Sequence, residues 1–215
     1  MNKDLEKRFY AFEIRAQEED TTGVLSGRPV VYNSWTNIGP FDEMIAPGAL
    51  DDTDLTDVRF LVNHNFDMIP LARSRRNNGN STMKLSVDSD GLSLDFVKLD
   101  VDNNADARAL YSAVGRGDMD GMSFCFSIED DEWEGLESEH PKRTIKKIGS
   151  IVEISAVTLP AYADTHIEID ARSREVLDRA RQAVDTARQE ARASAVDTAQ
   201  MLALEKARFD FVKNL

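Results

Sequence analysis

Short runs of aliphatic, aromatic and β-branched residues recur over residues 1–170, separated by turn-forming segments. Several runs alternate with polar residues, which is the two-residue period of a strand that has one face in a core. We expect strands at residues 24–32, 58–63, 83–87, 92–99, 122–128 and 144–159. The acidic residues 129–139 are expected to form an exposed loop before the last strand.

One segment of this region has the period of a helix. Residues 105–116 carry an apolar stripe made of Ala109, Leu110, Ala113 and Val114. The glycines at positions 115 and 117 mark its end. A mainly β domain with a packed helix follows from the pattern.

The pattern changes completely from residue 171 onward, where glycine and proline no longer occur. Small apolar residues recur at steps of three and four, which predicts a long helix or two helices joined near Ser194. The stripe consists of Leu177, Ala180, Val184, Ala187 and Ala191. Because alanines bury little surface, we expect this helix to dock weakly on the body or to meet a partner. The chain is therefore divided into a folded domain, 1–170, and a helical segment, 171–215.

Composition narrows the class of protein. Hydrophobic residues make up 41% and charged residues 30% of the 215 residues, which is typical of a folded chain. No apolar stretch reaches the roughly 20 residues of a membrane span, and no signal peptide is recognised at the N-terminus. The single cysteine, Cys125, excludes an internal disulfide. We expect a cytoplasmic protein with no membrane partner.

Charge argues against nucleic acid as a partner. The net charge is −13. Residues 171–215 contain nine Lys/Arg and seven Asp/Glu, a net charge of +2, which leaves −15 on the folded domain, 1–170. A body this acidic repels phosphates, whose binding depends on neutralisation by lysine and arginine. A neutral or basic protein partner is favoured instead.

His64 is the histidine whose position suggests chemistry. It ends the apolar run VRFLVN and opens a loop, which would hold its ring rigidly at the rim of a sheet. A half-buried histidine bonded to its own loop is the alternative. His140 precedes Pro141 beside the acidic segment and is expected at the surface, whereas His166 follows a turn-like segment.

Ser123 begins a predicted strand directly after a turn punctuated by glycines. A serine at such a point is held rigidly, but it is inert unless a base takes its proton, so His64 would have to come within reach. The spacing of the two residues along the chain does not decide between this pairing and an ordinary edge-strand serine. Cys125 is an alternative nucleophile, although its flanking phenylalanines suggest an inert, buried thiol. The histidines and the cysteine show no metal-ligand spacing.

Glu153 is the one carboxylate in the apolar run IGSIVEISAVTLP. A buried carboxylate is costly unless it has a hydrogen-bond or cationic partner. An imidazolium formed during catalysis would be a suitable partner.

Four segments, taken together, resemble the prohead maturation proteases of tailed phages, which are distant relatives of the herpesvirus assemblins. They are FDEMIAPGAL (41–50), NHNFDMIPLA (63–72), GMSFCF (121–126) and EISAVTLPAY (153–162), in the order of the family's own motifs. Two positions depart from the family pattern, which has aspartate in place of Asn65 and glycine in place of Cys125.

The resemblance implies an α+β fold, namely a small, mainly antiparallel β-barrel with packed helices, to which the long C-terminal helix is added. It implies a catalytic histidine and serine at His64 and Ser123, with no metal or cofactor. Glu153 is the preferred third catalytic residue, and Asp67 and His166 are the alternatives.

The implied function is that of a serine endopeptidase that cleaves the major capsid protein or its scaffolding segment, and also itself. It would self-associate and act inside the assembling prohead in the host cytoplasm. A non-enzymatic capsid-assembly scaffold is the competing interpretation, because the alanine-rich helix is typical of scaffolds. A cysteine hydrolase that uses Cys125 is the third.

Overall fold

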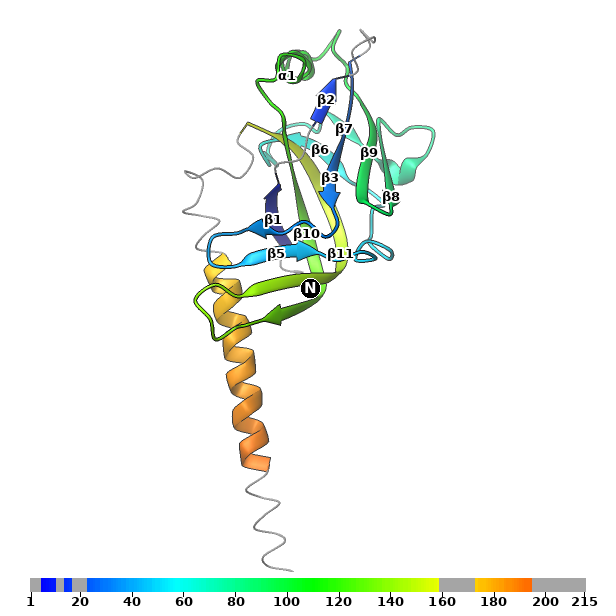
Figure 1. The fold of residues 1–215 in the computed structure, drawn as a ribbon. Coiled ribbons are helices and arrows are strands. Elements are labelled where there is room, and N and C mark those ends of the chain that lie inside the picture. The colour runs from blue at the N-terminus through cyan, green and yellow to red at the C-terminus, as the bar shows by residue number, and fades with distance from the viewer. Residues whose placement is uncertain (1–4, 11–13, 17–22, 159–172, 195–215) are drawn as a thin grey trace, which may run out of the picture.

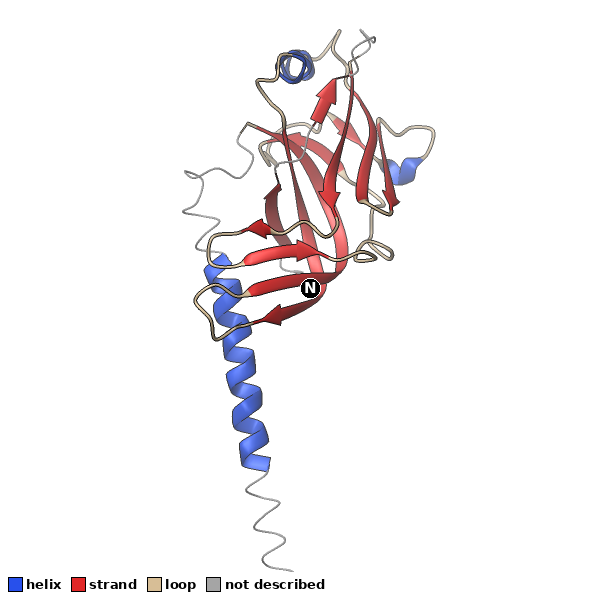
Figure 2. Cartoon of the chain, in the orientation of Figure 1, coloured by secondary structure: helices blue, strands red, loops and turns tan. Residues whose placement is uncertain are grey.

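The computed structural model describes residues 5–10, 14–16, 23–158 and 173–194 (Figure 1). Within these residues the chain forms two β-sheets, two α-helices and one short 3-10 helix (Figure 2). The strands are β1 (Leu5–Tyr10), β2 (Ile14–Ala16), β3 (Val24–Val31), β4 (Thr36–Asn37), β5 (Asp42–Ile45), β6 (Arg59–Val62), β7 (Ala72–Arg73), β8 (Met83–Asp88), β9 (Gly91–Lys98), β10 (Gly121–Glu134) and β11 (Lys142–Val157). Helix α1 spans Ala105–Gly115, a short 3-10 helix spans Arg75–Asn77, and the second α-helix spans 173–194. The predicted α+β class is confirmed.

The larger sheet is built around the β10–β11 hairpin. Its strand order is β1-β10-β11-β5-β4, and β6 also pairs with β11 and carries β7 on its other side. Strand β11 is long enough to pair with two strands in succession, β5 at residues 142–145 and β6 at residues 153–156, both parallel to it. All other strand pairs described are antiparallel, as predicted.

The residues that the structure describes do not close into the expected β-barrel. A closed barrel pairs every strand on both sides. Here the second sheet, β2-β3-β9-β8, has its own hydrogen-bonding path, and strands such as β1, β4 and β8 remain at sheet edges. The two sheets instead share one apolar core, to which β3, β8 and β9 contribute from one sheet and β6, β10 and β11 from the other. Several register shifts along β10–β11 bend this hairpin locally.

Strand β10 differs from its prediction at its far end. The acidic residues 129–134 were expected in a loop but continue the strand, paired with residues 142–147. The pairing places Asp130 opposite Lys147, and Lys146 binds Glu132 at 3.0 Å. Pairing with opposite charges on the neighbouring strand thus stabilises residues 129–134 as a strand, although their composition indicates a loop.

Helix α1 begins at its predicted position, and Asn104 caps it by accepting bonds from the backbone N–H groups of Asp106 and Ala107. Its buried residues are Ala107, Leu110 and Val114. The predicted stripe is therefore right at Leu110 and Val114 but wrong at Ala109, which is exposed.

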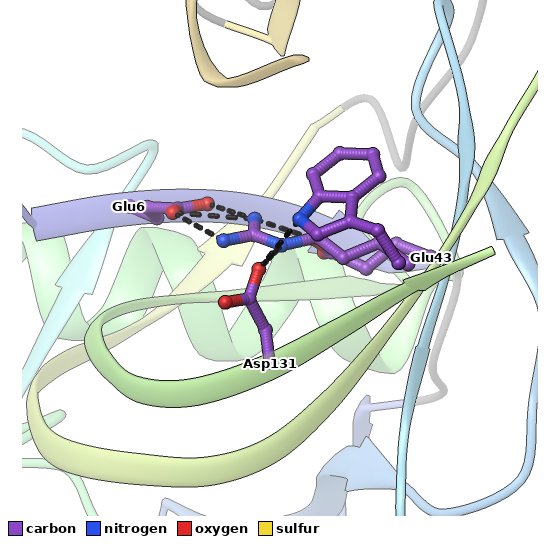
Figure 3. Close-up of polar contacts among 5 residues, drawn as sticks. Glu6, Glu43 and Asp131 are labelled. Atoms are coloured by element: carbon purple, nitrogen blue, oxygen red, sulfur yellow. Dashed lines mark hydrogen bonds and ion pairs between the residues drawn. The ribbon is translucent and has the colours of Figure 1, made fainter. Parts of the chain in front are cut away.

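A single arginine joins four neighbouring strands at one end of the larger sheet (Figure 3). Arg143 of β11 donates to Glu6 of β1 at 3.0 and 3.2 Å, to Asp131 of β10 at 2.7 Å and to Glu43 of β5 at 3.0 Å. The Trp133 ring lies 5.3 Å from the guanidinium carbon. The Arg143 side chain is 5% exposed and that of Glu43 is fully buried, so these charges depend on each other.

We predict that Arg143→Ala lowers the free energy of unfolding by about 3–5 kcal/mol, because it leaves the buried Glu43 carboxylate and the partly buried Glu6 and Asp131 carboxylates without their cation. Urea denaturation measures this change. The matched control is Lys146→Ala on the same hairpin, whose pair with Glu132 is exposed and contributes little. Equal effects of the two substitutions would contradict this account of the cluster.

The helix at residues 173–194 contacts the body through its first turns. Leu177 is 4% exposed and packs with Ile38 and Phe41 in a small cluster separate from the main core. Arg181 donates to the carbonyl groups of Leu136 and Ser138, both at 2.8 Å, in the β10–β11 turn. The rest of the helix extends away from the sheets (Figure 2).

Only part of the predicted apolar stripe is used for this docking. Leu177 is buried and Val184 is half-buried, whereas Ala187 and Ala191 are exposed. The remainder of the predicted C-terminal helix, residues 195–215, lies outside the described residues.

We predict that Leu177→Asp releases the helix without unfolding the body, because the main core contains no residue from this helix. Limited proteolysis should then cut within 173–194 faster, while the melting temperature of the body changes by less than about 2 °C. The control is Ala187→Asp, at an exposed position of the same helix. Loss of cooperative melting in Leu177→Asp would show that the helix completes the core.

Candidate active site

The loop after β6 turns back sharply at its first residues. Asn65 N–H donates to the carbonyl of Val62 at 3.1 Å, and the two central residues, Asn63 and His64, have φ of 52° and 54°. Left-handed φ at both central positions is the pattern of mirror-image turns, which asparagine tolerates better than most residues.

Hydrogen bonds of the turn residues hold the turn against β11 and the residue that follows this strand. Asn63 N–H donates to the carbonyl of Ala156 at 2.9 Å, and the Asn63 side chain accepts from Thr158 N–H at 3.0 Å. His64 N–H donates to the Ser155 hydroxyl at 3.1 Å. The His64 ring is consequently placed against β11, and the residue is only 7% exposed.

Glu153 lies in the part of β11 that pairs with both β10 and β6. Its Cα partners are Cys125 on β10 and Arg59 on β6, and the residue has no exposed surface. One carboxylate oxygen contacts His64 Nδ1, and the other accepts from the Ser155 hydroxyl at 2.6 Å. The buried carboxylate therefore has the hydrogen-bond partners that its burial requires.

Ser123 is the third residue of β10 and lies directly opposite Ser155 in the β10–β11 pair. Its hydroxyl oxygen is 2.6 Å from His64 Nε2, and the residue is fully buried. The strand pairing explains the proximity, because β6 and β10 both pair with β11 at residues 153–156 and so bring positions 64 and 123 to one place.

These contacts form one continuous chain from Ser123 through His64 to Glu153. A serine hydroxyl bonded to an imidazole, which is in turn bonded to a carboxylate, is the arrangement that makes serine nucleophilic in acyl transfer. With Nδ1–H donated to Glu153, the unprotonated Nε2 is free to accept the hydroxyl proton. The three residues singled out from the sequence are thus brought together.

The remaining candidate residues differ in exposure and position. Asp67 is exposed, and its backbone N–H donates to the Asn65 side chain at 3.1 Å. His140 is at the surface as predicted, where it binds Asp42 at 2.9 Å. His166 lies outside the described residues. Cys125 is buried, as its phenylalanine neighbours indicate, opposite Glu153 and two positions along the strand from Ser123.

Ser155 was not singled out by the sequence as a site residue. It contacts both His64 and Glu153, and it has no exposed surface. The available signal was its place two residues after Glu153, which puts both side chains on one face of the strand.

Neither a metal centre nor a membrane-spanning helix is found in the part of the chain that the structure describes. There, no three histidine, cysteine or acidic side chains gather as a metal site would require. No helix in the same residues has the length and hydropathy needed to cross a membrane.

The sequence matches a known family over most of its length. The family model described as caudovirus prohead serine protease matches residues 10–180. No curated protein and no solved structure shows significant similarity to the chain. The matched segment contains the Ser123, His64 and Glu153 positions.

Proposed function

We propose a specific reaction for this chain, which belongs to the caudovirus prohead serine protease family: Ser123 is the nucleophile, His64 its general base, and Glu153 the residue that orients His64. Membership makes the chain a serine peptidase of the assembling phage capsid, with capsid proteins as its substrates. The assignment of roles to individual residues, the scaffold substrate and self-cleavage are the proposal.

In the first step the Ser123 oxygen attacks the scissile carbonyl carbon while His64 Nε2 takes the hydroxyl proton. The tetrahedral intermediate then collapses, the C–N bond breaks, and the same proton passes from Nε2 to the leaving amine. Water repeats the sequence on the acyl-enzyme and releases the new carboxylate. Glu153 accepts from Nδ1–H throughout and stabilises the imidazolium that forms in each half-reaction.

One observation carries this proposal, the 2.6 Å separation of Ser123 Oγ and His64 Nε2. A general base must lie within about 2.6–3.2 Å of the atom whose proton it takes. Burial adds to the effect, because charges and dipoles interact more strongly away from water.

Glu153 is favoured over Asp67 and His166 as the third residue. Its carboxylate contacts the ring nitrogen of His64 that does not face Ser123. Asp67 lies exposed on the loop beyond the turn, where its backbone N–H bonds to Asn65.

We further propose that the chain cleaves the scaffolding segment of the major capsid protein and its own C-terminal part, and that it self-associates during assembly. The support is the division between the body and helix 173–194, which docks through a small cluster separate from the main core. A segment attached in this way can be removed while the core stays intact. The same exposed helix would serve as the contact with scaffold or with a second copy.

Ser123→Ala should abolish cleavage of capsid protein and shortening of the chain itself, with a loss of about 10⁴–10⁶-fold in rate. The fold should be retained, because only one hydroxyl is removed from a strand. His64→Ala should cause a similar loss, and the double variant should be no worse than either, since both residues serve one step. Gel electrophoresis with mass spectrometry of the products measures this.

The matched control for this experiment is Ser127→Ala, which removes a buried hydroxyl from the same strand. Ser127 bonds to Ser150 at 2.9 Å, away from His64. Its activity should equal that of the natural chain. Cleavage that persists in Ser123→Ala would contradict the proposal. So would a natural chain that neither cleaves capsid protein nor shortens itself, which is the behaviour expected of a non-enzymatic scaffold.

Glu153→Gln should reduce kcat by about 10²–10⁴-fold, less than the loss of Ser123, because the amide no longer fixes the Nδ1–H tautomer or stabilises the imidazolium. Asp67→Asn should have no effect. Steady-state kinetics on a capsid-protein substrate separates the two. A fully active Glu153→Gln beside an inactive Asp67→Asn or His166→Ala would move the assignment to that residue.

A further inference from the structure

We infer that Ser155 is a positioning residue for catalysis, one that holds the backbone of His64 directly and its ring tautomer through the Glu153 carboxylate. This inference rests on the proposed roles of Ser123, His64 and Glu153. Its basis is a closed ring of hydrogen bonds: His64 N–H to Ser155 Oγ at 3.1 Å, Ser155 Oγ to Glu153 Oε2 at 2.6 Å, and Glu153 Oε1 to His64 Nδ1. The backbone and the side chain of one histidine are thereby tied to each other.

The backbone N–H of His64 determines the direction of these hydrogen bonds, because it cannot act as an acceptor. A backbone N–H only donates, so Ser155 Oγ accepts from His64 and has its own single proton left to give. That proton goes to Glu153 Oε2, because an ionised carboxylate only accepts. This bond holds the carboxylate in the orientation in which its other oxygen, Oε1, accepts from His64 Nδ1–H. Nε2 consequently carries a lone pair toward Ser123, which is the tautomer that a general base requires.

Ser155 also supports an unfavourable backbone conformation. His64 has a φ of 54°, in the left-handed region that a residue with a side chain seldom adopts. Such conformations persist where surrounding contacts hold them, and they concentrate at functional sites. The Ser155 bond to His64 N–H is one such contact, and the bonds of Asn63 to Ala156 and Thr158 lie beside it.

Packing alone does not explain a serine at this position. Ser155 has no exposed surface, and its neighbours along β11, Ile154 and Ala156, are apolar. Its Cα partner across the strand pair is Ser123 itself. The Ser155 hydroxyl lies within hydrogen-bonding distance of His64 and Glu153, and we attribute its presence to the positioning of these two residues.

The test compares Ser155→Ala with Ser127→Ala, each of which removes a buried hydroxyl from the β10–β11 pair. We expect Ser155→Ala to lower kcat by about 10- to 100-fold, by analogy with outer-shell partners of metal-bound histidines. KM should not change, because Ser155 is not assigned a contact with substrate. Ser127→Ala should leave both constants unchanged.

A second measurement separates positioning from a loss of stability. The ¹⁵N NMR shifts of the His64 ring in the full-length chain report which nitrogen carries the proton. The natural chain and Ser127→Ala should show the neutral ring protonated at Nδ1, whereas Ser155→Ala should show a mixture of tautomers. A kcat within about twofold of the natural value, together with an unchanged tautomer in Ser155→Ala, would overturn the inference.

These outcomes distinguish the inference from the proposed function beneath it. If Ser123→Ala abolishes cleavage while Ser155→Ala alters neither kcat nor the tautomer, the proposed function holds and the inference fails. If the natural chain cleaves nothing but Ser155→Ala still changes the His64 tautomer, the positioning is supported and the proposed function fails.

Discussion

The structure around the site depends on the burial of one carboxylate. Glu153 has no exposed surface, yet it lies in a strand whose neighbours are apolar. An ionised group in such a place must receive hydrogen bonds, and a half-satisfied one would cost several kcal/mol. The two donors that approach it are the His64 ring and the Ser155 hydroxyl. Satisfying this carboxylate therefore orients the His64 ring, and the ring in turn lies against Ser123.

Strand β11 supports this arrangement, and it carries a buried charged residue near each end, Arg143 and Glu153. Near its start, Arg143 gathers carboxylates from three neighbouring strands and fixes how β1, β10, β11 and β5 lie together. Near its end, Glu153 holds the site residues. The two parallel partners, β5 and β6, lie beside these two centres in turn. One centre holds the sheet together, and the other is where we place the chemistry.

The sequence was sufficient where local pattern decides the structure. Strands β3, β6, β8, β9 and β11 and the start of β10 lie where the runs of apolar residues predict them, and each contributes buried residues. It was insufficient where distant pairing decides. Residues 129–134 are acidic but form a strand because basic residues of β11 lie opposite. Whether the sheet closes into a barrel is decided by which distant strands pair.

The approach of His64 to Ser123 also depends on the pairing of distant strands, since the separation of the two residues along the chain does not give their distance in space. Family motifs pointed to those residues, but the contacts of Ser155 with His64 and Glu153 could be found only in the folded structure.

The central claim is that His64 and Glu153 activate Ser123, and covalent labelling tests it most directly. A serine-directed fluorophosphonate reacts only with an activated hydroxyl, and mass spectrometry of the digested chain identifies the modified residue. The account predicts a single adduct on the peptide that contains Ser123, strongly reduced in His64→Ala and absent in Ser123→Ala. An adduct on another residue, or labelling of Ser123 at an equal rate when His64 is replaced, would contradict it.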